Sequence, residues 1–168
     1  QSILSSTHQD VEVFVCDDGS DLNAEEMVRS LIPQAVYHNT GSTIEDKLAK
    51  GIQIGKVANL FLSQTSADLA ITLGDDDELV PDYLERLVGY FHLHPNIMYA
   101  WSKIHLFNPL IESSNNCNNV TGHYNNWSGS INPVGKLDTS QVAYRVNCYR
   151  AYGIRYPETT RVADQPGL

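Results

Sequence analysis

Apolar and polar positions along the chain fall into alternating blocks that predict strands and helices in turn. Residues 11–16 (VEVFVC) and 69–73 (LAITL) are short apolar runs that stop at acidic turns, which is typical of buried strands. Residues 97–101 (IMYAW) and 139–146 (TSQVAYRV) predict two further strands.

The segments between these runs carry helical spacing. Met27, Val28 and Leu31 share one face of a helix that Asn23 or Asp21 can cap. Residues 42–45 (STIE) have the capping-box pattern, and a helix of about residues 56–65 follows two glycines.

The third helical pattern is the most regular. Leu84, Leu87, Val88 and Phe91 recur at i, i+3, i+4 and i+7, behind Pro81 at an expected first helical position. Strands that alternate with helices predict an α/β fold with a mostly parallel sheet flanked by helices. We expect one domain over residues 1–168, with a flexible Asn-, Ser- and Gly-rich loop at about residues 112–132.

Charge narrows the range of partners. The chain has 20 acidic residues against 11 Lys and Arg, a formal charge of −9, and no basic cluster. Nucleic-acid affinity comes mainly from Lys and Arg that neutralise phosphates, so a nucleic-acid binder is not expected. No apolar run or leader pattern predicts membrane insertion, and three widely spaced cysteines suit a reducing, cytoplasmic location.

The strongest chemical signal is the acidic triplet Asp75, Asp76 and Asp77, which follows the second apolar run. Neighbouring carboxylates form a partial ligand shell for Mg²⁺ or Mn²⁺, which waters and substrate phosphates complete. A solvated turn before a helix N-terminus, where acidic residues are favoured, explains the same residues. Composition alone leaves both interpretations open.

A second acidic pair, Asp17 and Asp18, ends the first predicted strand. Its carboxylates could accept hydrogen bonds from a ribose or a base, and Gly19 would let a ligand approach the backbone closely. An ordinary Asp-Gly turn is the alternative. Both acidic groups follow strands, and the carboxyl edge of an α/β sheet is where ligands bind.

These motifs together resemble those of family 2 glycosyltransferases of the GT-A fold, a Rossmann-like nucleotide-diphospho-sugar transferase architecture. The resemblance runs through QSILSSTHQDVEVFVCDDGSD and IGKVANLFLSQTSADLAITLGDDDELVPDYLERLV, and reaches LDTSQVAYR and VADQ near the end of the sequence. It implies a metal-dependent, inverting transfer of a sugar from a nucleotide-sugar, expected to be a UDP-sugar, to a hydroxyl acceptor.

The resemblance also implies roles for individual residues. Asp164 would be the catalytic base, and Asp77, with Asp75, would ligate Mn²⁺ or Mg²⁺. The residues expected to hold the donor are Asp17, Asp18, Lys56, Asn59, Asp75 and Asp76. Of these, Asp75 replaces a family aspartate that falls on Gly74, and Lys56 replaces a missing arginine.

Several departures from the family pattern keep alternatives open. The family's first strand would precede Gln1, so we expect a minimal or N-terminally truncated member, and Ala163 replaces the family's Glu beside the base. The alternative is a non-catalytic nucleotide-binding module with a GT-A-like core; a nucleotidyltransferase would need a Gly-rich basic loop that is not seen. A second copy could cover open strand edges in a homo-oligomer.

His123 could complete a metal shell or contact the acceptor, although an ordinary loop histidine is favoured. The neighbouring Tyr124 and Trp127 could stack on a sugar or pack their loop onto the core.

Overall fold

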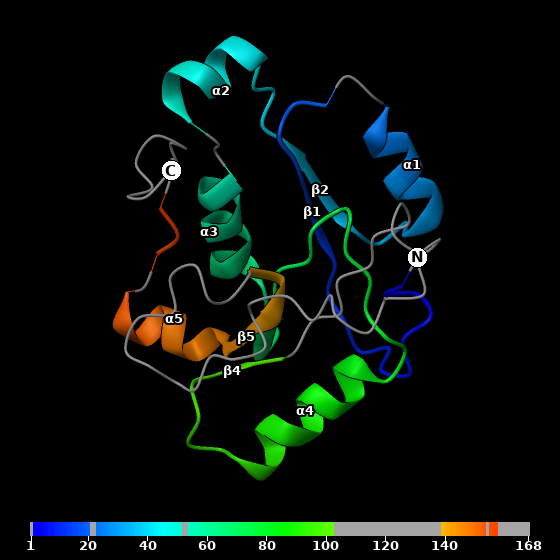
Figure 1. Ribbon diagram of the computed structural model, residues 1–168, viewed down its shortest axis with the longest axis vertical. Helices are drawn as coiled ribbons and strands as arrows, with labels where there is room; N and C mark the ends of the chain where they lie inside the picture. Colours follow the sequence, from blue (N-terminus) through cyan, green and yellow to red (C-terminus); the bar gives the residue numbers. More distant parts are fainter. Residues whose placement is uncertain (1, 21–22, 52–53, 103–138, 154, 158–168) are drawn as a thin grey trace, which may run out of the picture.

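The computed structural model describes residues 2–20, 23–51, 54–102, 139–153 and 155–157. Strands and helices alternate through most of these residues, as the sequence pattern predicts (Figure 1). The strands are β1 (Phe14–Asp17), β2 (Val36–Asn39), β3 (Leu69–Ile71), β4 (Tyr99–Trp101) and β5 (Val142–Arg145). The helices are α1 (Ala24–Leu31), α2 (Ile44–Lys50), α3 (Ile54–Gln64), α4 (Tyr83–Leu93) and α5 (Val146–Tyr152), with a 3₁₀ turn η3 (Thr139–Gln141) before β5.

The described strands form two sheets. β1 and β2 pair in parallel, with Asp17 opposite Asn39 at their carboxyl ends. In the other sheet β5 lies between β3 and β4 and is antiparallel to both, so β3 and β4 run in the same direction. The strands predicted at 11–16, 69–73 and 97–101 are confirmed in shorter form, whereas β2 was not predicted.

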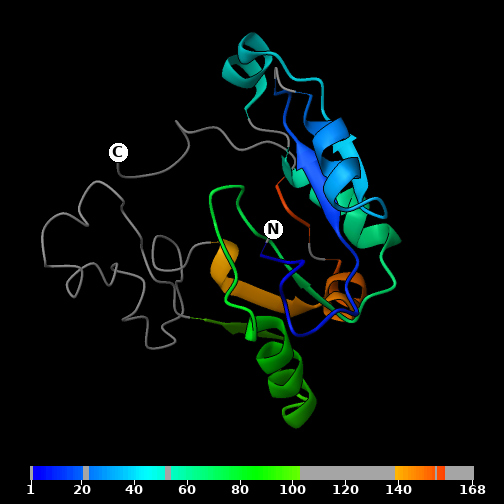
Figure 2. The same cartoon turned by 90° about the vertical axis from the view of Figure 1, so that its right-hand side faces the viewer.

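Helix α3 connects the two sheets (Figure 2). Its Phe61 stacks on Phe14 of β1, with ring centroids 4.7 Å apart. The next residue, Leu62, enters a buried cluster with Val146 and Tyr149 of α5. Burial of these apolar side chains supplies the driving force that joins the two sheets, because each removes apolar surface from water.

Arg145 fixes helix α4 to the opposite face of the second sheet. Its Nη2 donates to the Phe91 carbonyl at 2.7 Å and its Nε donates to the Ile97 carbonyl at 2.9 Å. The guanidinium carbon also lies 5.2 Å from the centre of the Phe91 ring. Phe91 is in the last turn of α4, where carbonyls lack partners within the helix, so Arg145 satisfies one of them.

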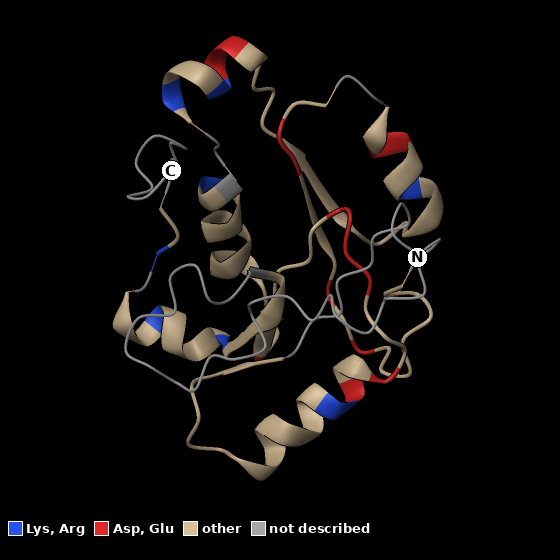
Figure 3. Ribbon diagram, viewed as in Figure 1, with Lys and Arg blue, Asp and Glu red and all other residues tan. Residues whose placement is uncertain are grey.

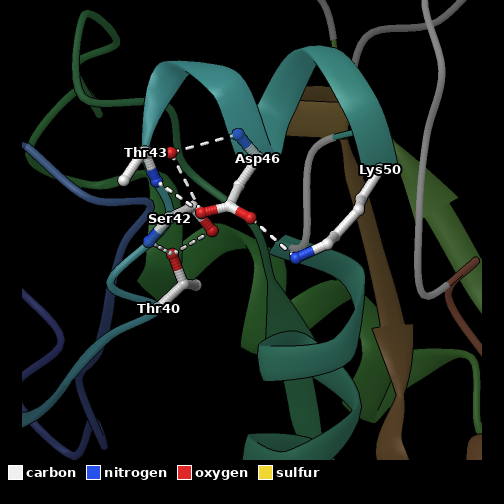
Figure 4. Close-up of polar contacts among 5 residues, drawn as sticks. All are labelled: Thr40, Ser42, Thr43, Asp46 and Lys50. Carbon is white, nitrogen blue, oxygen red and sulfur yellow. Dashed lines mark hydrogen bonds and ion pairs between the residues drawn. The ribbon is translucent and has the colours of Figure 1, made fainter.

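The capping box of α2 begins one residue later than the sequence pattern predicts (Figure 4). Thr43 is the N-cap: its hydroxyl accepts from the Asp46 amide at 3.1 Å, and the Asp46 carboxylate accepts from the Thr43 amide at 3.2 Å. Ser42 instead faces Thr40, with 2.9 Å between their hydroxyl oxygens. Likewise α4 begins at Tyr83 with Asp82 as N-cap, so Pro81 precedes the helix.

None of the helices in the described ranges combines the length and apolar character that crossing a bilayer requires. The predicted loop at 112–132 lies outside the described residues.

Candidate functional site

The carboxylate of Asp17 is buried at the end of β1 and is surrounded by hydrogen-bond donors. Its Oδ1 accepts from the Ser20 amide at 2.7 Å. Its Oδ2 accepts from the Ser20 hydroxyl at 2.7 Å, from the Tyr37 hydroxyl, and from Asn39 Nδ2 at 3.2 Å. Burial alone would raise the pKa of Asp17, but the bonds from Tyr37 and Ser20 outweigh it and hold that pKa below its ordinary value. Asp17 therefore anchors the turn as a carboxylate.

Asp18, the next residue, is bound by the residue that follows β2. The Thr40 hydroxyl donates to Asp18 Oδ1 at 2.7 Å. Gly19 then turns the chain with φ of +77°, and a Cβ at this position would lie 2.0 Å from the Ser42 carbonyl oxygen. A side chain there is excluded both by the backbone conformation and by this contact. The turn after β1 thus packs directly on the loop between β2 and α2.

A pocket of about 400 Å³ opens between this turn and the start of α2. Its walls are formed by Gly19, Ser20, Asn39, Gly41, Ser42, Thr43, Ile44 and Glu45. The pocket therefore lies at the carboxyl ends of two parallel strands, where ligands bind in α/β sheets. Backbone, hydroxyl and amide groups line most of it, which suits a polar ligand.

The acidic triplet lies in the loop after β3 and is exposed to solvent (Figure 3). The Asp77 amide donates to the Gly74 carbonyl at 3.2 Å and closes the turn. A Cβ on Gly74 would lie 2.9 Å from carboxylate oxygens of both Asp76 and Asp77, so these side chains fold back over the glycine. The sequence interpretation placed Gly74 where the family has an aspartate, and a side chain at this position would require the exposed carboxylates of Asp76 and Asp77 to shift.

Asp77 also accepts a hydrogen bond from the 3₁₀ turn that precedes the central strand of the second sheet. The Ser140 hydroxyl donates to Asp77 Oδ2, and the Gly74 amide donates to Ser140 Oγ at 3.4 Å. Ser140 belongs to η3, which leads into β5, the neighbour of β3. The antiparallel pairing of β5 with β3 thus brings Ser140 to the acidic loop.

Within the described ranges, no three His, Cys, Asp or Glu side chains are grouped so that they could hold a metal ion. The two acidic groups occupy separate places, one at the end of β1 and one in the loop after β3 (Figures 2 and 3). A cation at Asp75 and Asp77 would therefore need further ligands from water, substrate or other parts of the chain.

Two expected donor-binding residues lie on α3. Lys56 is exposed in its first turn. Asn59 has its amide occupied internally: Oδ1 accepts from the Tyr149 hydroxyl at 2.7 Å and the Tyr156 amide at 2.9 Å, and Nδ2 donates to the Tyr156 carbonyl at 3.0 Å. The proposed base Asp164 lies outside the described residues, as do His123, Tyr124 and Trp127.

Cys16, immediately before the acidic pair, is not a candidate nucleophile. Burial, together with the negative charges of Asp18 and Asp17, raises the pKa of its thiol to about 11. The reactive thiolate is therefore scarce at neutral pH.

Sequence reasoning missed the groups that orient the carboxylates, namely Tyr37, Thr40 and Ser140. Tyr37 and Thr40 come from β2 and its end, and they could have been found by pairing a second parallel strand with β1. Ser140 had no such local signal, because its contact with Asp77 depends on the position of β5 in the sheet.

A comparison with protein families is consistent with this geometry. The family model described as Glycosyl transferase family 2 matches residues 1–126 of the 168 residues. No curated protein matches the chain at a significant level.

Proposed function

Because the chain belongs to glycosyl transferase family 2 and has the family's GT-A fold, we propose that it transfers a sugar from a UDP-sugar to an acceptor hydroxyl with inversion. The observation that carries the proposal is the polar pocket at the carboxyl ends of β1 and β2, next to Asp17 and Asp18. Glycosyl transfer follows from the family; the donor, the cation and the inversion are proposed.

The nucleotide would bind at the turn after β1. Asp18, oriented by Thr40, would accept a hydrogen bond from the base. Asp17 would stabilise this turn and would not contact the nucleotide, since its carboxylate oxygens already accept hydrogen bonds from Ser20, Tyr37 and Asn39. Preorganised acceptors lower the cost of ordering the site when the ligand binds.

The acidic loop suits a divalent cation. Asp75 and Asp77 offer exposed carboxylate oxygens, the hard ligands that Mn²⁺ and Mg²⁺ prefer, and Ser140 restrains Asp77. A bound cation would neutralise the diphosphate that departs from the sugar. Asp76 would contact the ribose, and Lys56 would add positive charge near the phosphates.

Asp164 would act as the general base. In a single displacement the acceptor oxygen forms a bond to the anomeric carbon as the bond to the diphosphate oxygen breaks. The acceptor's proton passes to the Asp164 carboxylate, which requires that Asp164 be ionised at neutral pH.

Calorimetric titration of UDP with and without Mn²⁺ tests the donor site. We expect Mn²⁺ to raise UDP affinity and Asp77→Asn to abolish that gain, because the cation loses a charged ligand. Asp10→Asn is the matched control: it removes the same charge from an exposed position on the amino-terminal side of β1, and should leave the gain intact. UDP binding that is independent of metal in both wild type and Asp77→Asn would refute the metal site.

A screen of nucleotide-sugars for metal-dependent transfer and hydrolysis tests catalysis itself and names the donor. Turnover of one of them is the expected result. Nucleotide binding without any turnover would instead identify a binding module with a GT-A core.

A further inference from the structure

The backbone of Tyr156 is paired with the side chain of Asn59 at both of its polar groups. Asn59 Oδ1 accepts from the Tyr156 amide at 2.9 Å, and Nδ2 donates to the Tyr156 carbonyl at 3.0 Å. One carboxamide thus binds a peptide segment in the way that a neighbouring strand would. The Tyr149 hydroxyl donates to the same Oδ1 at 2.7 Å and holds the carboxamide in this orientation.

The rest of the segment 155–157 is held just as closely against α3 and α5 (Figure 1). Gly55, one helical turn before Asn59, faces Pro157, and a Cβ there would lie 1.9 Å from the Pro157 carbonyl oxygen. Only glycine allows this approach. The Arg155 guanidinium carbon lies 4.9 Å from the centre of the Tyr149 ring.

The side chain of Tyr156 completes the attachment. Its hydroxyl lies 3.1 Å from that of Tyr144, and its ring packs against the buried cluster of Leu62, Val146 and Tyr149. Burial and the hydrogen bond with Tyr156 raise the pKa of Tyr144, so the Tyr144 hydroxyl stays protonated at physiological pH. Backbone, side chain and flanking residues of the segment are therefore all held by described groups.

We propose that Asn59 and Gly55 are positioning residues that fix the start of the segment carrying Asp164, and that Asn59 does not bind the donor. This inference rests on the proposed role of Asp164 as the base. Asn59 Oδ1 already accepts from Tyr149 and Tyr156, and one Nδ2 hydrogen is donated to Tyr156, so the carboxamide is oriented toward this segment. Asp164 follows Pro157 by seven residues in the sequence. Attachment at 155–157 sets where that stretch begins.

Hydrogen exchange and kinetics on the full chain test the proposal with Asn59→Ala and Gly55→Ala. In both variants we expect faster exchange at the Tyr156 amide, which loses its partner or is displaced. With the UDP-sugar that the wild type consumes fastest, kcat should fall by about 10- to 100-fold, the scale of a small misplacement of a catalytic group. The dissociation constant of UDP with Mn²⁺ should not change.

Two further variants calibrate these readouts. Asp164→Asn should show the same kinetic pattern, with kcat lost and UDP binding kept, but wild-type exchange at Tyr156. Ser63→Ala, which removes an exposed hydroxyl from the same helix, should match the wild type in every measurement.

The outcomes separate the alternatives. Weaker UDP binding by Asn59→Ala with unchanged exchange at Tyr156 would make Asn59 a donor contact and overturn the proposal. Faster exchange at Tyr156 with wild-type kcat would show that the attachment serves stability alone, and this result would also overturn the proposal. If the wild type consumes no nucleotide-sugar, the proposed function fails, and exchange at Tyr156 still decides whether α3 holds this segment.

Discussion

Asp17 and Asp18 are adjacent in the sequence, yet their surroundings separate their roles. Asp17 is buried and accepts hydrogen bonds from Ser20, Tyr37 and Asn39, whereas Asp18 is half-buried and accepts from Thr40. A sequence interpretation that treats the pair as two donor contacts cannot make this distinction. The difference arises because consecutive residues at a strand end face opposite sides.

The lowered pKa of Asp17 predicts a loss of stability in acid. A carboxyl whose pKa is lower in the folded state stabilises folding above its unfolded pKa, near 3.8, and this contribution disappears as pH falls through the folded value. Tyr37→Phe removes one of the bonds responsible and should cost about 1 to 2 kcal/mol of unfolding free energy at neutral pH. Because protonated Asp17 gains less from Tyr37, that cost should shrink in strong acid. Urea unfolding across this range measures it, and an equal cost at every pH would contradict the assignment.

The positions of the acidic runs could be predicted from the sequence better than the residues that orient their carboxylates. The runs DDGS and GDDDE are local signals, and the structure has the first at the end of β1 and the second in the loop after β3. Thr40 and Ser140 contact these runs across 22 and 63 residues of sequence. Such contacts depend on strand pairing, which no local pattern reports.

Among single elements, those with buried apolar positions were predicted more successfully than exposed ones. Helix α4 was predicted from its apolar spacing, and Leu84 and Phe91 are buried as expected. Strand β2 (VYHN) was missed because it is mostly exposed and lacks apolar alternation. Helix α5 begins at Val146 with Arg145 as N-cap, so the last predicted strand, at 139–146, ends one residue earlier than expected. The antiparallel direction of β5 likewise had no signature in the sequence.

Helix α4 contains a glycine whose replacement should stabilise the protein. A Cβ on Gly89 would meet nothing within 4 Å, so Gly89→Ala gains helix propensity without a clash, worth about 0.5 to 1 kcal/mol. Gly41 is the control: its surroundings are equally open, but φ is +65°, so Gly41→Ala should cost about 1 kcal/mol through backbone strain. Chemical denaturation measures both. A loss of stability in Gly89→Ala would show that α4 has a contact at this position.

For the whole molecule, the central question is how two small sheets hold together. Among the described elements, α3 contacts both β1 and α5, and α5 continues from β5. Figure 2 shows α3 beside β1 and close to α5. The proposed donor pocket belongs to the first sheet, and the acidic loop follows a strand of the second. Helix α3 therefore provides one route by which the proposed nucleotide and metal sites can be coupled.

A substitution of Phe61 tests whether α3 joins the two sheets. It is buried and stacks on Phe14, so Phe61→Ala should cost about 3 to 5 kcal/mol of unfolding free energy. If α3 unites the sheets, hydrogen exchange of Phe61→Ala under mild denaturant should show the same loss of amide protection at Val15 in β1 and at Ala143 in β5. Leu60→Ala, at an exposed position on the same helix, should change neither amide appreciably. A loss of protection confined to Val15 would mean that the two sheets unfold independently and would contradict the role of α3 in joining them.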